Sequence, residues 1–247
     1  MKFWQSLKGQ RPVAGYLWCG WLALLMLTLL WDLSALDLAT MDLIGSVNGF
    51  SLQHQTLLEV WLHDRLRTLG WLIYLGGWGW ALFWKPSRSF RRADRVFLMT
   101  MVTINLLLIV GLKHMSKTSC PWSVRNWGGI ASYVSHWRWG VADGGPGHCF
   151  PAGHASTAWA FAPLVLAAFW TPGIRVKNSA MAWINSAFSI GVVLTALTQT
   201  LRGAHYPSHS LWTGVICTGT SLMAWTIWQK RLATQRAHAK SSHVRSA

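Results

Sequence analysis

Apolar residues gather in six long runs, and polar segments rich in turn-forming residues separate these runs. Each run has the length, or nearly the length, that an α-helix needs to cross the hydrocarbon core of a bilayer. The second run is short and rich in glycine, so we expect its helix to extend back into the stretch before it. The pattern predicts an all-α integral membrane protein, a bundle of six transmembrane helices forming a single domain over 1–247. The predicted spans are 14–33, 68–84, 96–113, 155–172, 180–200 and 209–228.

The composition agrees with a membrane protein. Apolar residues make up 52% of the chain and charged residues only 12%, whereas a soluble domain usually carries about 25% charged residues. The 19 tryptophans suit an interfacial aromatic belt. So apolar a chain is not disordered, and 4 cysteines are too few for a disulfide scaffold. The net charge of +15 would suit a DNA-binding protein, but that class leaves the apolar runs unexplained, so we expect no nucleic acid partner.

The distribution of Lys and Arg predicts the orientation of the bundle. With six spans, 15 of the 22 basic residues fall on one face, which the positive-inside rule makes cytoplasmic together with both termini. These residues lie in the N-terminal segment, in the loops after the second and fourth spans, and in a basic, frayed tail over 229–247. The opposite, outer face then holds the segments 34–67, 114–154 and 201–208.

The outer face carries basic residues that the positive-inside rule disfavours. Five of the remaining seven lie in or at the edges of the loops after the third and fifth spans, so we expect an anionic ligand there. Arginine offers a fork of donors to phosphate oxygens, and lysine offers a compact charge. The seven are Arg65, Arg67, Lys113, Lys117, Arg125, Arg138 and Arg202.

Histidines crowd into the same two loops. A histidine can act as a nucleophile or a general acid near neutral pH, so basic residues with histidines suit phosphoryl transfer without a metal. Zinc is a weaker alternative, because only Asp143, Cys120 and Cys149 offer further ligands nearby. The histidines of these loops are His114, His136, His148, His154, His205 and His209.

Three segments together resemble the motifs of the type 2 phosphatidic acid phosphatase family, membrane lipid phosphatases related to the vanadium haloperoxidases. KHMSKTSCP (113–121) resembles the first motif, K-x6-R-P, with Cys120 in place of Arg. PAGH (151–154) resembles P-S-G-H, with Ala152 in place of Ser. RGAHYPSHSLW (202–212) resembles S-R-x5-H-x3-D, with His209 in place of Asp and with its Arg three rather than six residues before the first His. The combination is similar to a divergent bacterial branch of the family that works in envelope lipid metabolism.

The resemblance implies a site at the outer leaflet that needs no metal or other cofactor. It implies that His205 attacks phosphorus and forms a phosphohistidine, which water then hydrolyses. His154 would protonate the leaving oxygen. His209 would orient the nucleophile as the family's Asp does, and the reverse assignment, with His209 attacking and His205 assisting, stays open.

The phosphate itself would be bound by basic groups and by backbone. Lys113 and Arg202 are the candidate cations, and Gly153 would let a phosphate approach free backbone N–H groups. Arg125 or Lys117 would replace the arginine that the first motif lacks. The stretch 56–68 has one apolar and one charged face and is predicted to be an interfacial helix, which could also border the site through His63.

The cysteines of the outer loop form a separate prediction. Cys120 and Cys149 both lie in this loop, and an envelope compartment is oxidising, so we expect a disulfide between them. Such a bond would tie the first motif to the second and hold Lys113 near His154. Cys19 and Cys217 lie within predicted spans, as small apolar residues.

The leading hypothesis is therefore a lipid phosphatase of the bacterial inner membrane, with its site on the periplasmic face and membrane lipid as its substrate. Undecaprenyl diphosphate is the first choice of substrate, because an outward-facing site suits the recycling of that carrier. A lipid phosphotransferase of the same family is one alternative, since a lipid hydroxyl could capture the phosphohistidine. A non-catalytic lipid-binding family member is the other. The oligomeric state stays open.

Overall fold

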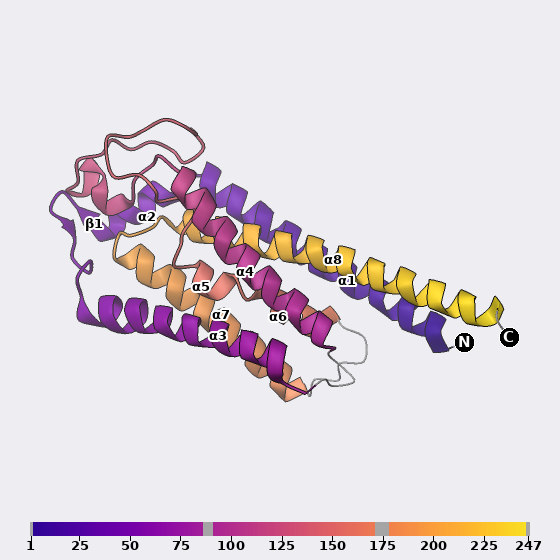
Figure 1. The fold of residues 1–247 in the computed structure, drawn as a ribbon. Helices are drawn as coiled ribbons and strands as arrows, with labels where there is room; N and C mark the ends of the chain where they lie inside the picture. The colour runs from indigo at the N-terminus through magenta and orange to yellow at the C-terminus, as the bar shows by residue number, and fades with distance from the viewer. Residues whose placement is uncertain (1, 86–90, 171–177, 246–247) are drawn as a thin grey trace.

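The computed structural model describes residues 2–85, 91–170 and 178–245, and in this part the chain is largely helical. Most of the long helices run roughly along one axis, with connecting segments gathered at its two ends (Figure 1). The short strands β1 and β2 form an antiparallel hairpin in which Gly45 lies opposite Phe50. The elements are α1 (Lys2–Leu33), α2 (Leu36–Ile44), β1 (Gly45–Ser46), β2 (Gly49–Phe50), the π-helix η1 (Leu57–Arg65), α3 (Leu66–Phe83), α4 (Arg92–Met115), the 3-10 turns η2 (Pro121–Ser123) and η3 (Arg125–Trp127), α5 (Ser156–Trp159), α6 (Ala162–Trp170), α7 (Asn178–Leu201) and α8 (Pro207–Arg245).

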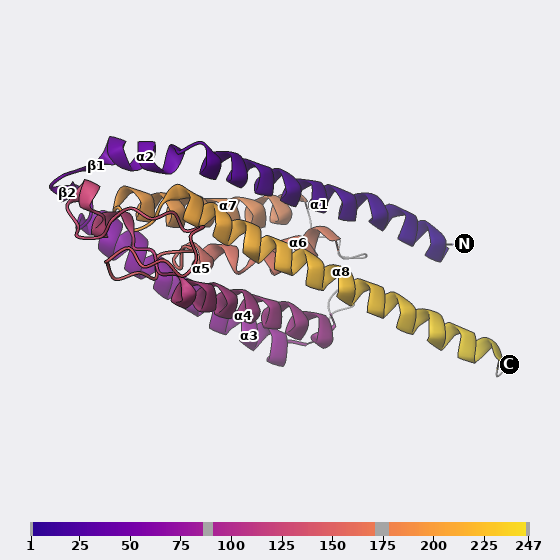
Figure 2. The ribbon, with the colours of Figure 1, turned by 90° about the horizontal axis from the view of Figure 1, so that it is seen from above.

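The two ends of the bundle differ in kind. One end collects both termini, the end of α3 and the start of α4, and the end of α6 and the start of α7 (Figures 1 and 2). The other end collects α2, the β hairpin, the long loop after α4 and the turn between α7 and α8. The helix ends that flank the segments predicted to be cytoplasmic thus share one end, and Arg88, Arg175 and Lys177 of these segments lie outside the described residues. Which end faces the cytoplasm stays a prediction.

Among the described residues, three helices are long and apolar enough to cross a membrane: Ala14–Leu33 of α1, all of α4, and Met181–Leu201 of α7. They agree with the first, third and fifth predicted spans. Helices α3 and α8 cover the second and sixth, but their glycine, tryptophan and hydroxyl residues make them less apolar. The bundle of six spans therefore stays a prediction. The prediction of a frayed tail was wrong over 229–245, because α8 continues as a helix to Arg245. Residues 246–247 lie outside the described part.

The fourth predicted span was wrong as a single helix. The chain forms the short helix α5, turns at Ala160 and Phe161, and resumes as α6; residues 171–172 lie outside the described part. Pro163 in the first turn of α6 explains the break, because proline has no N–H to donate to the carbonyl four residues earlier. The apolar stretch Ser156–Phe169 is in consequence a shorter, interrupted element.

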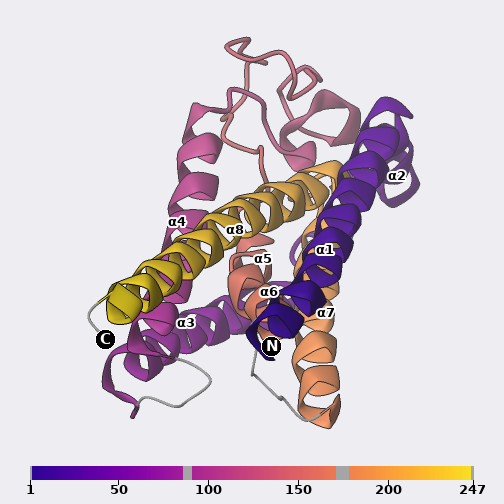
Figure 3. The same cartoon turned by 90° about the vertical axis from the view of Figure 1, so that its right-hand side faces the viewer.

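This broken element occupies the middle of the bundle. Seen from the end that holds the termini, α5 and α6 lie among α8, α1, α7, α3 and α4 (Figure 3), and both contact α4, α7 and α8. Irregular backbone is tolerated at membrane depth where protein surrounds it and satisfies its polar groups. Here the buried Asn105 of α4 does so, since its Nδ2 donates to Ala160 O (3.3 Å) and to Ser221 Oγ (3.1 Å). Thr220 Oγ1 of α8 donates to Asn105 Oδ1 (2.7 Å), so one amide joins α4, the α5–α6 turn and α8.

We expect Asn105→Leu to destabilise the protein by about 1–3 kcal/mol, because the carbonyl of Ala160 and the hydroxyls of α8 lose their buried partner. The measurement is the thermal unfolding midpoint in detergent. Leu107→Ala on the same helix is the control, and we expect a smaller shift because the side chain of Leu107 is 65% exposed. An unchanged midpoint for Asn105→Leu would contradict this account of the turn.

Candidate active site

The three motif segments converge at the end of the bundle that holds the long loop. Lys113 lies in the last turn of α4, Gly153 and His154 lie in the turn that enters α5, and His205 lies in the turn between α7 and α8. A methyl group added at Gly153 would lie 3.3 Å from Lys113 Nζ, so the ammonium group rests against this glycine. The structure thus brings Lys113, Gly153, His154 and His205 together, from parts of the sequence far from one another.

His154 is a neutral imidazole within a group of cations. Burial lowers its pKa to about 3, with further lowering by His63, Lys113, Arg67 and Arg202. Its ring lies 3.9 Å from the ring of His63, centroid to centroid. Its Nε2 is buried and has no hydrogen-bond partner within the described part of the chain. An anion bound here would reduce the repulsion that keeps the proton away from His154 and would raise its pKa.

His205 is buried and held in one ring orientation. Its Nδ1 lies 3.3 Å from Cys149 Sγ, and its backbone N–H donates to Gln199 O. Burial lowers its pKa well below the ordinary value, with Lys113 and His154 adding to the effect. Since a disulfide sulfur carries no hydrogen, Nδ1 is the donor in this contact, and the lone pair of Nε2 is then free. A neutral imidazole with a free Nε2 lone pair is what nucleophilic attack requires.

His209 does not take the place of the family's Asp. Its Nδ1 donates to Cys149 O (3.2 Å), and its ring centroid is 6.0 Å from that of His205. The rings of His136, Phe150 and Tyr206 lie around it, and only 1% of the residue is exposed. His205 is also buried, at 3% exposed, so burial does not decide between the two histidines, and the reverse assignment stays open. The contacts of His209 are those of a side chain that holds the loop residue Cys149 against α8.

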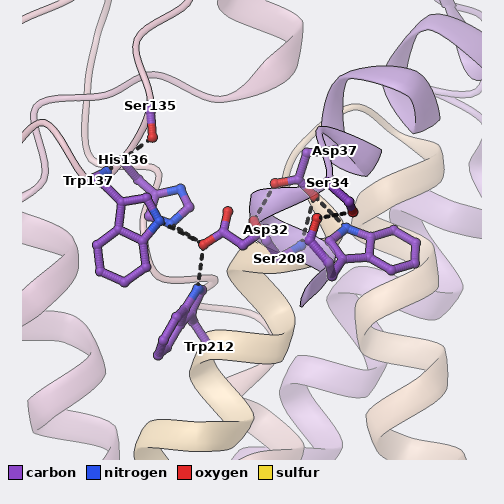
Figure 4. Close-up of polar contacts among 9 residues, drawn as sticks. Asp32, Ser34, Asp37, Ser135, His136, Trp137, Ser208 and Trp212 are labelled. Carbon is purple, nitrogen blue, oxygen red and sulfur yellow. Dashed lines mark hydrogen bonds and ion pairs between the residues drawn. The ribbon is translucent and has the colours of Figure 1, made fainter. Parts of the chain in front are cut away.

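Two aspartates of the α1–α2 corner hold the site from the side (Figure 4). Asp32 Oδ2 accepts from Nε1 of Trp212 (2.9 Å) and of Trp137 (2.8 Å), and it pairs with His136 Nε2 (3.2 Å). The buried Asp37 caps the first turn of α8, because its carboxylate accepts from the backbone N–H and the hydroxyl of Ser208. The long loop and the start of α8 are thereby fixed to the same corner. Sequence reasoning did not assign these aspartates to the site, since nothing near them in the sequence marks a partner.

The predicted phosphate-binding side chains differ in their contacts and in their exposure. Arg202 is buried, but its Nε donates to Gln53 O (2.9 Å) and its Nη2 to Glu59 Oε1 of η1 (2.9 Å), so much of this guanidinium is engaged by η1 and by a carbonyl of the segment before it. Arg125 is exposed and donates to Ile130 O, and Lys117 is also exposed. No contact among the described residues brings Arg125 or Lys117 to the motif histidines.

The backbone expectation needs a correction at one position. The N–H of Ala152 is not free for a ligand, because it donates to His209 O (3.2 Å), and the residue is fully buried. The methyl group that replaces the motif's serine is therefore part of the packing between the loop and α8. Gly153 has Lys113 Nζ beside it, and its role in binding phosphate stays a prediction.

The predicted disulfide between Cys120 and Cys149 is confirmed. The two sulfurs and a ring nitrogen of His205 lie within 4.8 Å of one another, which is the spacing of a metal site. Zinc binds thiolates, however, and the two sulfurs here are bonded to each other. The residues present therefore do not fit a zinc ion while the disulfide is intact.

A family comparison decides the identity of this arrangement. The model of the PAP2 superfamily matches residues 95–233, which is more than half of the chain. The chain belongs to the PAP2 superfamily. The matched range includes all three motif segments and the central element α5–α6. No curated protein and no solved structure matches the chain significantly. Members of the PAP2 superfamily are generally phosphatases, so membership indicates activity on phosphate esters.

We expect the stability of this PAP2 protein to fall in acid because of His154. Its pKa of about 3 in the folded state lies below the 6.5 of an ordinary histidine, so below pH 6.5 the unfolded chain binds more protons. Stability is therefore highest above pH 6.5, and the cost for this one group between pH 7 and pH 5 is about 2 kcal/mol. His154→Gln should reduce the acid shift of the thermal midpoint, whereas His114→Gln, at an exposed position, should not. An identical pH dependence in wild type and His154→Gln would contradict the prediction.

The disulfide is tested by alkylation of the denatured protein without reductant, followed by mass spectrometry. We expect label on Cys19 and Cys217, which are free, and none on Cys120 or Cys149. Reduction before alkylation should label all 4 cysteines. Label on both loop cysteines without reductant would show that the bond does not form.

Proposed function

We propose that the protein is a metal-independent lipid phosphatase of the bacterial inner membrane, with its site on the periplasmic face. The observation that carries this proposal is the convergence of Lys113, Gly153, His154 and His205 at one end of membrane-length helices. A cationic site without a carboxylate among these four side chains suits a phosphate, and its place at the end of the bundle suits a headgroup. The gathering of the basic connecting segments at the opposite end supports the periplasmic orientation.

The geometry supports a two-step reaction. Nε2 of His205 attacks phosphorus, the bond from phosphorus to the leaving oxygen breaks, and a phosphohistidine forms. His154 gives its proton to the leaving oxygen. Burial and the neighbouring cations keep His154 neutral in the free site. It takes up a proton together with the substrate, because the anion offsets the repulsion by these cations. Water then attacks the phosphohistidine, His154 accepts a proton from this water, and inorganic phosphate leaves as His205 is restored.

The roles of the other groups follow from their contacts. Lys113 stabilises charge that develops on the phosphate oxygens, since its ammonium group rests against Gly153. Cys149 orients His205 in the way that a carboxylate would otherwise do, by facing its Nδ1. As the lipid itself, undecaprenyl diphosphate is our first choice, because recycling of that carrier suits an outward-facing site.

The proposal is tested by phosphate release in detergent with EDTA present. The panel contains undecaprenyl diphosphate, phosphatidylglycerol phosphate, phosphatidic acid and a lipid A phosphate. We expect His205→Ala to reduce the rate to background, and His154→Ala to reduce it by about 10²- to 10⁴-fold, as loss of a general acid does. His114→Ala, at an exposed position on α4, is the control and should keep the wild-type rate.

Each other result has a distinct meaning. Loss of activity on adding EDTA would overturn the metal-free mechanism, and full activity of His205→Ala would move the nucleophile to His209. Transfer of phosphate to an added lipid alcohol, in place of release, would identify a phosphotransferase. No product from any lipid in the panel would leave a non-catalytic family member.

A further inference from the structure

One face of the η1–α3 segment borders the site, as the sequence suggested for His63, and this face also carries a basic residue that had no predicted role. His63 lies with its ring against that of His154 (3.9 Å between centroids). Seven residues on, a methyl group added at Gly70 would lie 3.4 Å from Thr157 Cβ of α5. Tyr74 OH, four residues further, lies 2.9 Å from Thr103 Oγ1 of α4. Positions 63, 70 and 74 thus share one helical face, and this face packs on α5 and α4.

Arg67 lies on the same face, one turn after His63 and one turn before Gly70. Its place is therefore beside the turn that enters α5, next to His154. The side chain is exposed and makes no hydrogen bond or ion pair with any residue that the structure describes. The other nearby arginines are engaged: Arg202 with Glu59 and Gln53, and Arg65 over the ring of Trp61 at 5.9 Å. Of these three arginines, Arg67 is therefore the one whose guanidinium can bind a ligand without losing a contact to the described residues.

The side of the site on which Arg67 lies is the side of the leaving group. In an in-line displacement the leaving oxygen lies opposite the nucleophile, so it points from His205 toward His154. Arg67 and His63 lie on the His154 side of the site, where the ring of His63 packs at a tilt against the ring of His154. In agreement, Arg67 contributes to the lowered pKa of His154, while the groups that lower the pKa of His205 are Lys113, His154 and His63.

We propose that Arg67, together with His63, binds the second phosphate of a diphosphate substrate, so that the site prefers a lipid diphosphate to a lipid monophosphate. This inference rests on the proposed phosphatase function. The bond that breaks is then the one between the terminal phosphorus and the bridging oxygen, and the leaving group is the lipid monophosphate. The guanidinium offsets the charge that develops on this leaving group, while His154 protonates its oxygen. A fork of two donors fits two phosphate oxygens, which an ammonium group at this position could not match.

The experiment compares farnesyl diphosphate with farnesyl monophosphate in detergent, for wild type, Arg67→Gln and Arg67→Lys. We expect wild type to have the larger kcat/KM on the diphosphate. In Arg67→Gln the ratio of the two kcat/KM values should fall by about tenfold or more, the size of a lost charge-assisted hydrogen bond. Arg67→Lys should recover part of the ratio. Arg65→Gln, two residues away and turned toward Trp61, is the matched control and should keep the wild-type ratio.

The outcomes of this experiment distinguish a failure of the proposed role of Arg67 from a failure of the proposed phosphatase function. Equal losses on both substrates in Arg67→Gln, or a wild type that prefers the monophosphate, would overturn the role of Arg67 and leave the phosphatase in place. A wild type that releases phosphate from neither compound nor from the lipid panel would overturn the proposed function itself. Because a ratio measured on one preparation does not depend on how much of it is folded, a poorly folding variant remains informative, and Arg67→Lys provides the second reading.

Discussion

Cys149 is the residue on which the arrangement of the site depends. Its Sγ faces Nδ1 of His205 at 3.3 Å, its carbonyl accepts from Nδ1 of His209, and its disulfide leads to Cys120. One loop residue thereby contacts the ring of His205, the first turn of α8 and the segment that follows α4. In the family motif a carboxylate four residues after the nucleophile performs the orienting role. Here an adjacent loop performs it, covalently tied in place, and this is consistent with the substitution of His209 for that carboxylate.

The acidic and the basic residues near the site have different partners. The seven carboxylates of the chain are few, and those near the site hold the fold: Asp32 and Asp37 fix the long loop and α8, and Glu59 holds Arg202. The cations beside His154 and His205 are thus left without a carboxylate that neutralises all of them. Burial lowers the pKa of both histidines, and these cations lower it further. Such a group of cations attracts an anion.

Much of the fold was predictable because hydrophobic periodicity reports the surroundings of a helix directly. The first, third and fifth spans agree with the helices at those places. The break between α5 and α6 was missed because a run of apolar residues does not reveal whether its helix is continuous, although Pro163 was the available signal. The extension of α8 to Arg245 was missed for the opposite reason, since a polar, basic sequence carries no apolar face that would mark a helix.

The sequence by itself determined the membrane-length apolar helices, the motif segments that contain Lys113, Gly153, His154 and His205, and the pairing of Cys120 with Cys149. These are local patterns, or patterns of composition, and they can be read without knowing the fold. Only the tertiary structure decided how the arginines beside His154 are engaged within the described part of the chain. Arg202 belongs to a motif segment but is held by Glu59, whereas Arg67, far from any motif, shares a helical face with His63, whose ring packs against His154. Whether an arginine side chain can bind a ligand depends on the partners that packing places beside it, and the spacing of residues along the chain does not reveal those partners.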